Sequence, residues 1–181
     1  SKMKKAIHNS IALTLVIGVV LTVVGLVFND PILKAIGVPS DVFSEASTYL
    51  SIYFWSLIFV MIYNMGSGIL RSVGDSKRPL YFLIFSSVIN IVLDFLFVKN
   101  FGFGVAGAGY ATLIAQAISA IMVMYVLMKT EDSYKVVLKD IKFDKEILLK
   151  IIKIGLPTGF QQSIVSLSNV IVQSYINVYG A

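Results

Sequence analysis

The sequence contains no cysteine and a single histidine, His8, and only 14% of its 181 residues are charged. The absence of cysteine excludes a disulfide framework, a thiolate metal site and a cysteine nucleophile. The histidine lies alone at the edge of an apolar segment, so neither a histidine metal cluster nor a histidine-based hydrolytic triad can be assembled. A soluble domain usually carries roughly a quarter charged residues, which argues against a water-soluble globule.

Apolar residues make up 57% of the chain and gather in five long runs. We predict that each run is a membrane-spanning helix, with bounds at Ile11–Phe28, Tyr49–Leu70, Leu80–Val98, Phe103–Met128 and Ile154–Val178. These lengths match the roughly 20 helical residues that cross a hydrocarbon core, and the runs lack the strict alternation of a membrane β-strand. The expected fold class is therefore all-α, a polytopic membrane helical bundle.

Basic residues lie mainly on one side of the predicted membrane. Thirteen of the 15 Lys and Arg fall there: Lys2, Lys4, Lys5, Arg71, Lys77, Arg78, Lys129, Lys135, Lys139, Lys142, Lys145, Lys150 and Lys153. Because short cytoplasmic loops retain Lys and Arg, we expect a multi-pass protein of the plasma membrane with a cytoplasmic N-terminus, surrounded by membrane lipids. The basic residues sit between the apolar runs rather than on one face, so no nucleic-acid partner is expected.

A charged segment separates the fourth span from the fifth. We interpret residues 129–153 as a cytoplasmic linker between two bundles, with residues 1–128 as part of an N-terminal helical bundle and 154–181 as the first span of a C-terminal bundle. The linker is expected to hold an interfacial helix capped by Asp144, and Pro157 is expected to break or kink the helix that follows. A plain tether is the alternative for the linker.

Asp94 is the one charged residue inside the predicted spans. An ionised carboxylate at the centre of a spanning helix costs about 2.5 to 3.5 kcal/mol. Ser86, Asn90 and Asp94 recur every four residues, so they share a helix face that we expect to point into protein. Burial favours the protonated carboxyl, and oxygen ligands also suit a small hard cation such as sodium. The alternative is that Asp94 reaches the membrane interface.

Thr112 of the next span is the candidate that completes an oxygen-rich pocket with Asn90 and Asp94. The two spans are joined by a short turn and are expected to be antiparallel neighbours, and small residues on the second span permit close packing. Depth along the helices places Thr112 near Asn90. The alternative is that Thr112 bonds a carbonyl of its own helix.

The last span carries an unusual number of uncharged polar residues, ten of 25 being Thr, Ser, Asn or Gln. Gln162, Ser166, Asn169 and Gln173 form a polar stripe that we expect to line a wet cavity. Hydrogen bonding between helices is the alternative. No second acid, histidine pair or activated nucleophile accompanies Asp94 in the sequence, so we expect neither an enzyme nor a cofactor.

Four runs, in their order along the chain, add a resemblance to a known family. They are Arg71–Pro79 (RSVGDSKRP), Asn90–Asp94 (NIVLD), Gly102–Thr112 (GFGVAGAGYAT) and Gly155–Gln162 (GLPTGFQQ). Together they resemble the multidrug and toxic compound extrusion (MATE) family of transporters. The resemblance implies twelve spans in two six-helix bundles, of which this chain would supply spans three to seven, with the flanking spans as its missing partners.

The same resemblance implies a function and a site. Family members expel small organic cations in exchange for sodium ions or protons, and their cation site includes an Asn and an Asp on the fifth span and a Thr on the sixth. These positions match Asn90, Asp94 and Thr112. The family's site also includes an Asp on the first span, which this sequence does not contain, so the site is expected to be incomplete here and the chain should not transport alone.

Two other functional classes stay open from the sequence. A lipid-linked sugar flippase of related architecture would use the basic loops to attract anionic headgroups. A non-transporting membrane scaffold or a channel subunit would use the polar stripe for assembly or as a passive pore. Gradient-driven export of an organic cation would distinguish an antiporter from all of these.

Overall fold

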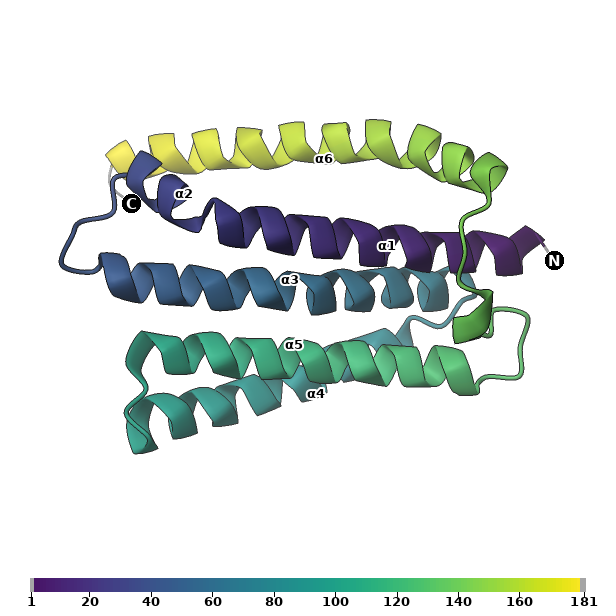
Figure 1. Cartoon of the computed structure of the whole chain (residues 1–181), viewed down its shortest axis with the longest axis horizontal. Coiled ribbons are helices and arrows are strands. Elements are labelled where there is room, and N and C mark those ends of the chain that lie inside the picture. Colours follow the sequence, from purple (N-terminus) through teal and green to yellow (C-terminus); the bar gives the residue numbers. More distant parts are fainter. Residues whose placement is uncertain (1, 180–181) are drawn as a thin grey trace. The chain divides into compact units, whose positions relative to one another are not determined.

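The backbone of residues 2–179 is described by a computed structural model, which also describes the side chains of residues 2–169, 171 and 172. The elements, drawn in Figure 1, are α1 (Lys2–Val27), α2 (Asn29–Ala35), α3 (Phe43–Ser72), α4 (Lys77–Asp94), the π-helix η1 (Phe95–Asn100), α5 (Gly104–Lys129), the 3₁₀ turn η2 (Leu138–Asp140) and α6 (Lys145–Tyr179). The described backbone is helical without strands, which confirms the all-α fold class. It forms two compact units, Ser1–Lys142 and Phe143–Ala181.

Four helices of the first unit are long and apolar enough to cross a membrane: Lys2–Val27, Phe43–Ser72, Lys77–Asn100 and Gly104–Lys129. Each overlaps one of the first four predicted spans, and the first helix begins nine residues before its predicted span. The third continues from α4 directly into η1, so the helical path is longer than α4 alone. The fifth predicted span falls within α6, whose side chains are described only in part.

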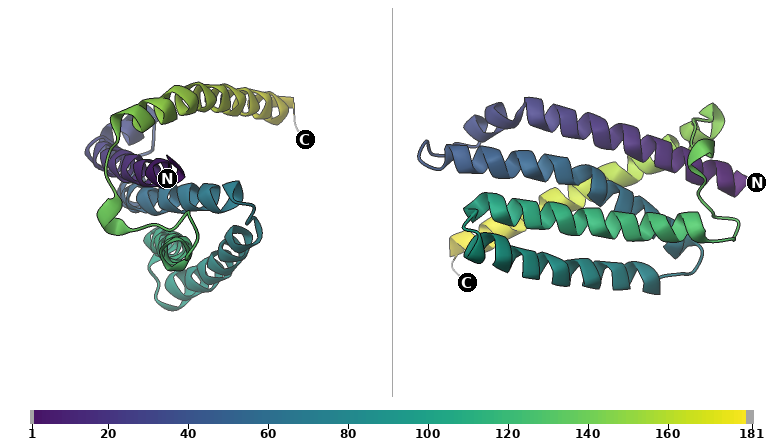
Figure 2. Two further views of the ribbon diagram at one scale, coloured as in Figure 1. Left: turned by 90° about the vertical axis from the view of Figure 1, so that its right-hand side faces the viewer. Right: turned by 60° about the horizontal axis from the view of Figure 1, so that its bottom comes forward.

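The four long helices of the first unit lie in the order α1, α3, α5, α4 (Figure 2). In this row α3 packs on both α1 and α5, and α4 packs mainly on α5. The N-terminus of α1 lies at the same end of the unit as the last residues of α3 and α5, and we call this the amino-terminal end. Because α4 lies at the edge of this row, only 6% of the apolar stretch in the helix Lys77–Asn100 is buried within the chain.

Glycines allow the helices of this row to approach closely. A methyl group at Gly25 of α1 would lie 2.2 Å from Cδ1 of Phe54 on α3, and one at Gly66 of α3 would lie 2.8 Å from a methyl of Val123 on α5. The most buried apolar cluster includes Ile11, Leu70, Leu127 and Val136, near the amino-terminal end. This cluster packs α1, α3, α5 and the segment that follows α5 against one another.

The second unit consists mainly of α6. α6 begins at Lys145, directly after Asp144. The backbone N–H of Ile147 lies 3.4 Å from a carboxylate oxygen of Asp144, so Asp144 caps the helix as predicted. The helix then continues through Pro157, so it is not broken there, and the alternative of a kink stays a prediction. A proline removes one backbone donor, and the helices of membrane proteins tolerate this loss.

Candidate cation site and adjoining pocket

The polar face of α4 points toward protein, as its four-residue spacing predicts. Ser86 is buried, and Asn90 and Asp94 are half-buried along the same line. On the opposite face the apolar side chains are exposed, with Ile91 at 68% and Val88 at 54%. Because α4 packs mainly on α5, the site residues lie on the side of α4 that faces the bundle.

Two side-chain atoms on this face are buried without a hydrogen-bond partner among the described residues: Oδ1 of Asp94 and Nδ2 of Asn90. Most buried polar atoms in proteins are bonded, so each exception requires an explanation. Rotating the Asn90 side-chain amide by half a revolution exchanges the positions of its nitrogen and its oxygen. This side chain can therefore present either a donor or an acceptor. Asn29 Oδ1 and Ser67 Oγ are unpartnered too, but only Asp94 carries a carboxyl group.

Asp94 lies at the junction between α-helical and π-helical backbone. α4 ends at this residue, and the π-helix η1 continues from Phe95 to Asn100, where the helical path ends. The chain then reverses through Gly102 and Gly104, whose φ angles of +66° and +57° favour glycine. This reversal brings α5 back antiparallel to α4 and fixes the end of the bundle near Asp94.

Thr112 is half-buried on α5, the helix on which α4 packs. The described hydrogen bonds include none between Thr112 and Asn90 or Asp94. They also include none from Thr112 to its own helix, unlike Thr22, which donates to the carbonyl of Gly18. The structure therefore places Thr112 on the expected neighbouring helix with its hydroxyl unengaged, and its part in cation binding stays a prediction.

Asp94 is the one carboxyl group on this face of α4. Among the described residues, no three His, Asp or Glu side chains are grouped closely enough to bind a metal ion. Carboxyl and amide groups such as those of Asp94 and Asn90 can hold a proton or a small hard cation.

The polar stripe of the last predicted span lies on α6. Gln162, Ser166 and Asn169 are exposed there, and the side chain of Gln173 lies outside the described residues. Their lining of a cavity stays a prediction.

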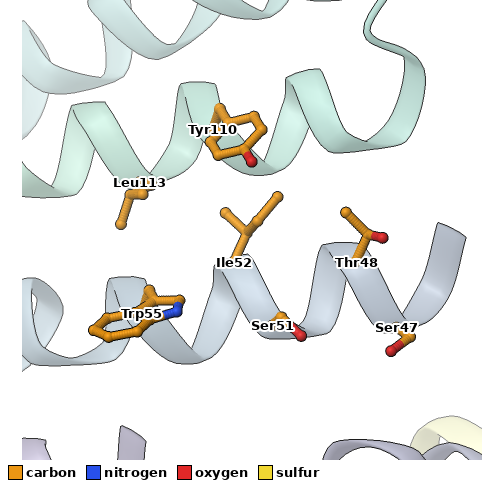
Figure 3. A pocket seen from close by; sticks show the side chains of 7 residues that line it. All are labelled: Ser47, Thr48, Ser51, Ile52, Trp55, Tyr110 and Leu113. Atoms are coloured by element: carbon orange, nitrogen blue, oxygen red, sulfur yellow. The ribbon is translucent and has the colours of Figure 1, made fainter. Parts of the chain in front are cut away.

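A pocket of about 450 Å³ lies between α3 and α5. Its lining consists of Ser47, Thr48, Ser51, Ile52, Trp55, Tyr110 and Leu113. Figure 3 shows Leu113 directed from α5 toward α3, and Thr48 and Ile52 directed from α3 toward α5, while the Tyr110 ring lies over the α5 ribbon. Trp55 and Tyr110 remain 56% and 46% exposed, so two aromatic rings border an open space.

Sequence reasoning assigned no role to this pocket. The signal was present in part, since Ser47, Ser51 and Trp55 follow each other at four-residue spacing on one helix face. Ser47 and Ser51 also accept hydrogen bonds from Nδ2 of Asn29, at 3.2 and 2.6 Å, which anchors α2 on α3. The partner residues on α5 could not be identified without knowing the packing of the two helices.

The relatives found by comparison with known proteins agree with one another in the family and the kind of protein that they name. The MatE family model matches residues 1–96. The chain is 35% identical to the probable multidrug resistance protein YoeA of Bacillus subtilis, over 99% of this chain and 40% of the relative. It is 27% identical to the multidrug export protein MepA of Staphylococcus aureus, again over 99% of this chain and 40% of the relative.

A solved structure agrees in fold. It is an outward-facing multidrug resistance MATE family transporter of the MOP superfamily, superposed with a TM-score of 0.84 at 31% sequence identity. The match covers 94% of this chain and 38% of that structure. The chain thus spans about 40% of the length of the relatives that it matches.

Proposed function

This chain belongs to the MatE family of multidrug transporters, and we propose that it forms part of a secondary antiporter that exports small organic cations in exchange for sodium ions or protons. The family is one of transporters rather than enzymes, and the chain is a multi-pass membrane protein. Because it spans about 40% of its relatives' length, we propose that flanking spans complete the working transporter.

The observation that carries the proposal is the unpartnered carboxylate oxygen of Asp94 on the protein-facing side of α4. A buried carboxylate oxygen without a partner is unfavourable, and a bound proton or sodium ion would supply the missing partner. Asn90, one helical turn earlier, adds a second group that can ligate a cation or share a proton. Thr112 would supply a third oxygen from α5.

Cation binding at Asp94 would drive export by changing the stability of two conformations. A ligand shifts a conformational equilibrium only through different affinities for the two states. Neutralising Asp94 removes the penalty of enclosing its charge, so the occupied site favours the more enclosed packing of α4. The organic cation, held near the same carboxylate, would then compete with the coupling ion and be released.

The orientation and the cavity follow as parts of the same proposal. The basic loops favour a cytoplasmic N-terminus, which would put Asp94 toward the outer side of the membrane. Gln162, Ser166, Asn169 and Gln173 would line the aqueous path of the substrate from the second bundle. Organic cations, membrane lipids and the flanking spans are the partners that this arrangement requires.

Transport by the complete antiporter in sealed vesicles tests the proposal. Export of the fluorescent cation ethidium is driven by an imposed sodium or proton gradient and compared between the parent and Asp94→Asn. The asparagine keeps the size of the side chain but cannot hold a proton or pair with sodium in the same way. Gradient-driven export should fall by about tenfold or more, since a hydrogen bond to a charged group contributes about 1.5 to 3 kcal/mol.

Asp41→Asn is the matched control, because it removes an exposed carboxyl in the loop before α3. Export by this variant should equal that of the parent. Undiminished uphill export by Asp94→Asn, with equal amounts of folded protein in the vesicles, would rule out the proposed role of Asp94.

A further inference from the structure

The side chain of His8 joins two segments that are distant in the sequence. His8 lies on α1 and is only 2% exposed. Its Nδ1 lies 2.7 Å from the carbonyl oxygen of Lys4. Its Nε2 lies 3.0 Å from the backbone nitrogen of Val137 and 3.1 Å from the carbonyl oxygen of the same residue. Both ring nitrogens therefore contact backbone groups.

These contacts indicate which nitrogen carries the proton. The carbonyl of Lys4 can only accept a hydrogen bond, so Nδ1 must be the donor in the shorter contact. A neutral ring with its proton on Nδ1 leaves a lone pair on Nε2, which can accept the backbone N–H of Val137 at 3.0 Å. A charged ring would instead donate from Nε2 to the Val137 carbonyl at 3.1 Å. The neutral form satisfies both nitrogens without placing a charge on a side chain that is only 2% exposed.

Two other attachments hold the same segment on the first unit. The backbone N–H of Val136 donates to the carbonyl of Leu127 at 2.8 Å, and the Val136 side chain is 2% exposed within the apolar cluster. Farther along, the Lys4 ammonium lies 2.8 Å from a carboxylate oxygen of Asp140. The first compact unit ends two residues later, at Lys142.

We infer that His8 is a positioning residue, which in its neutral Nδ1-protonated form fastens residues 130–142 to the first unit. The connection between the two units is then free to bend only after Lys142, rather than along the whole charged segment from residue 129. The inference rests on contacts within the first unit, so it holds or fails independently of the proposed antiport.

Two substitutions separate the roles of the ring nitrogens. In His8→Gln the side-chain oxygen reaches about the position of Nε2 and can accept the Val137 N–H. In His8→Asn the shorter amide can donate to the Lys4 carbonyl but cannot reach Val137. Glutamine is also closer to histidine in volume, so the protection of the Val137 amide itself, rather than overall stability, distinguishes the hydrogen bond from space filling.

Hydrogen exchange and limited trypsin cleavage of the full chain in lipid nanodiscs measure the attachment. In His8→Asn the Val137 amide should exchange about tenfold faster, as expected for the loss of one buried hydrogen bond. Cleavage after Lys135 and Lys139 should accelerate in parallel. His8→Gln should stay within about twofold of the parent in both measurements. Cleavage after Lys150, in the second unit, serves as an internal control and should not change.

A measurement on the unsubstituted protein keeps the inference testable if a variant does not fold. Nitrogen NMR of the labelled His8 ring at neutral pH should show a protonated Nδ1 and an unprotonated Nε2. A protonated Nε2 would overturn the inference. So would parent-like exchange of Val137 in His8→Asn, or equally fast exchange in both variants.

Discussion

Polar side chains of α1 and the two polar side chains nearest the end of α4, Asn90 and Asp94, have different surroundings. On α1, Thr22 donates to the carbonyls of Gly18 and Phe54 at 2.8 and 3.1 Å, and both ring nitrogens of His8 are engaged. On α4, Asp94 and Asn90 each keep a buried atom without a partner among the described residues. A helix can therefore carry polar groups in a membrane bundle for two different reasons.

The difference separates a structural role from a functional one. Bonded polar groups on α1 fix its position against α3 and the segment that follows α5. Unbonded groups on α4 raise the free energy of the empty site, and a cation that binds there removes this penalty. Substitutions on α1 should therefore affect stability, whereas those on α4 should affect the response to cations.

The largest effect on stability is expected where α1 and α3 approach most closely. In Gly25→Ala the new methyl would meet the Phe54 ring at 2.2 Å, so the ring and its surroundings must shift. We expect the free energy of unfolding in detergent to fall by about 1 to 3 kcal/mol, as for other overpacked sites. Denaturant titration followed by circular dichroism provides the measurement.

Gly68→Ala is the control for this substitution. Gly68 also lies in α3, but an added methyl there meets no atom within 4 Å among the described residues. Its stability should be unchanged or slightly higher, because alanine favours helix by up to about 1 kcal/mol. Equal losses in Gly25→Ala and Gly68→Ala would show that close packing of α1 on α3 is not the cause.

A smaller effect should distinguish the polar groups of the two helices directly. Thr22→Val removes a hydroxyl that donates across to α3, and should cost about 0.6 kcal/mol, the average for such bonds in membrane proteins. Asn90→Leu removes an amide whose Nδ2 has no partner, so stability should stay the same or increase. The same titration compares both variants with the parent. Similar destabilisation by the two substitutions would contradict the distinction.

The smallest effect concerns the exposed ion pair near the end of the first unit. The hydrogen bond from Lys4, together with its positive charge, holds the pKa of Asp140 below its ordinary value. The carboxylate therefore favours the folded attachment above its unfolded pKa, and this contribution is lost as the pH falls through the lowered pKa. Both side chains are exposed, so the effect should be slight and should weaken with salt.

Hydrogen exchange of the amides around Asp140, measured as the pH is lowered through the acid range, checks this expectation. Protection in the parent should decline on acidification, and Asp140→Asn should remove that decline. An unchanged pH dependence in Asp140→Asn would mean that another group causes it.

Much of the first unit could be predicted because its signals are local. Long apolar runs located the four spans, and four-residue spacing identified the side of α4 that faces protein. The start of α1 was predicted nine residues late, at Ile11, whereas the helix begins at Lys2. The polar residues of its first turns are typical of a segment outside the membrane. The sequence does not show that His8 among them is covered by residues 136 and 137, far along the chain.

The pocket between α3 and α5 was missed for the same reason. Trp55 and Tyr110 each resemble ordinary aromatic residues of a membrane helix. They line the same pocket only because of the way α3 and α5 pack together. The candidate cation site was easier to predict because a lone carboxyl in an apolar run is conspicuous. Whether Thr112 joins that site depends on the position of its hydroxyl when a cation is bound.

Difference infrared spectroscopy of the complete transporter can show whether a cation binds at the Asp94 carboxyl. Spectra are recorded as sodium is added and as the pH is lowered, and the carboxyl signal is assigned by its absence in Asp94→Asn. The proposal predicts that one of the two cations changes the Asp94 signal and that ethidium reverses the change. An Asp94 carboxyl that responds to neither cation would contradict it.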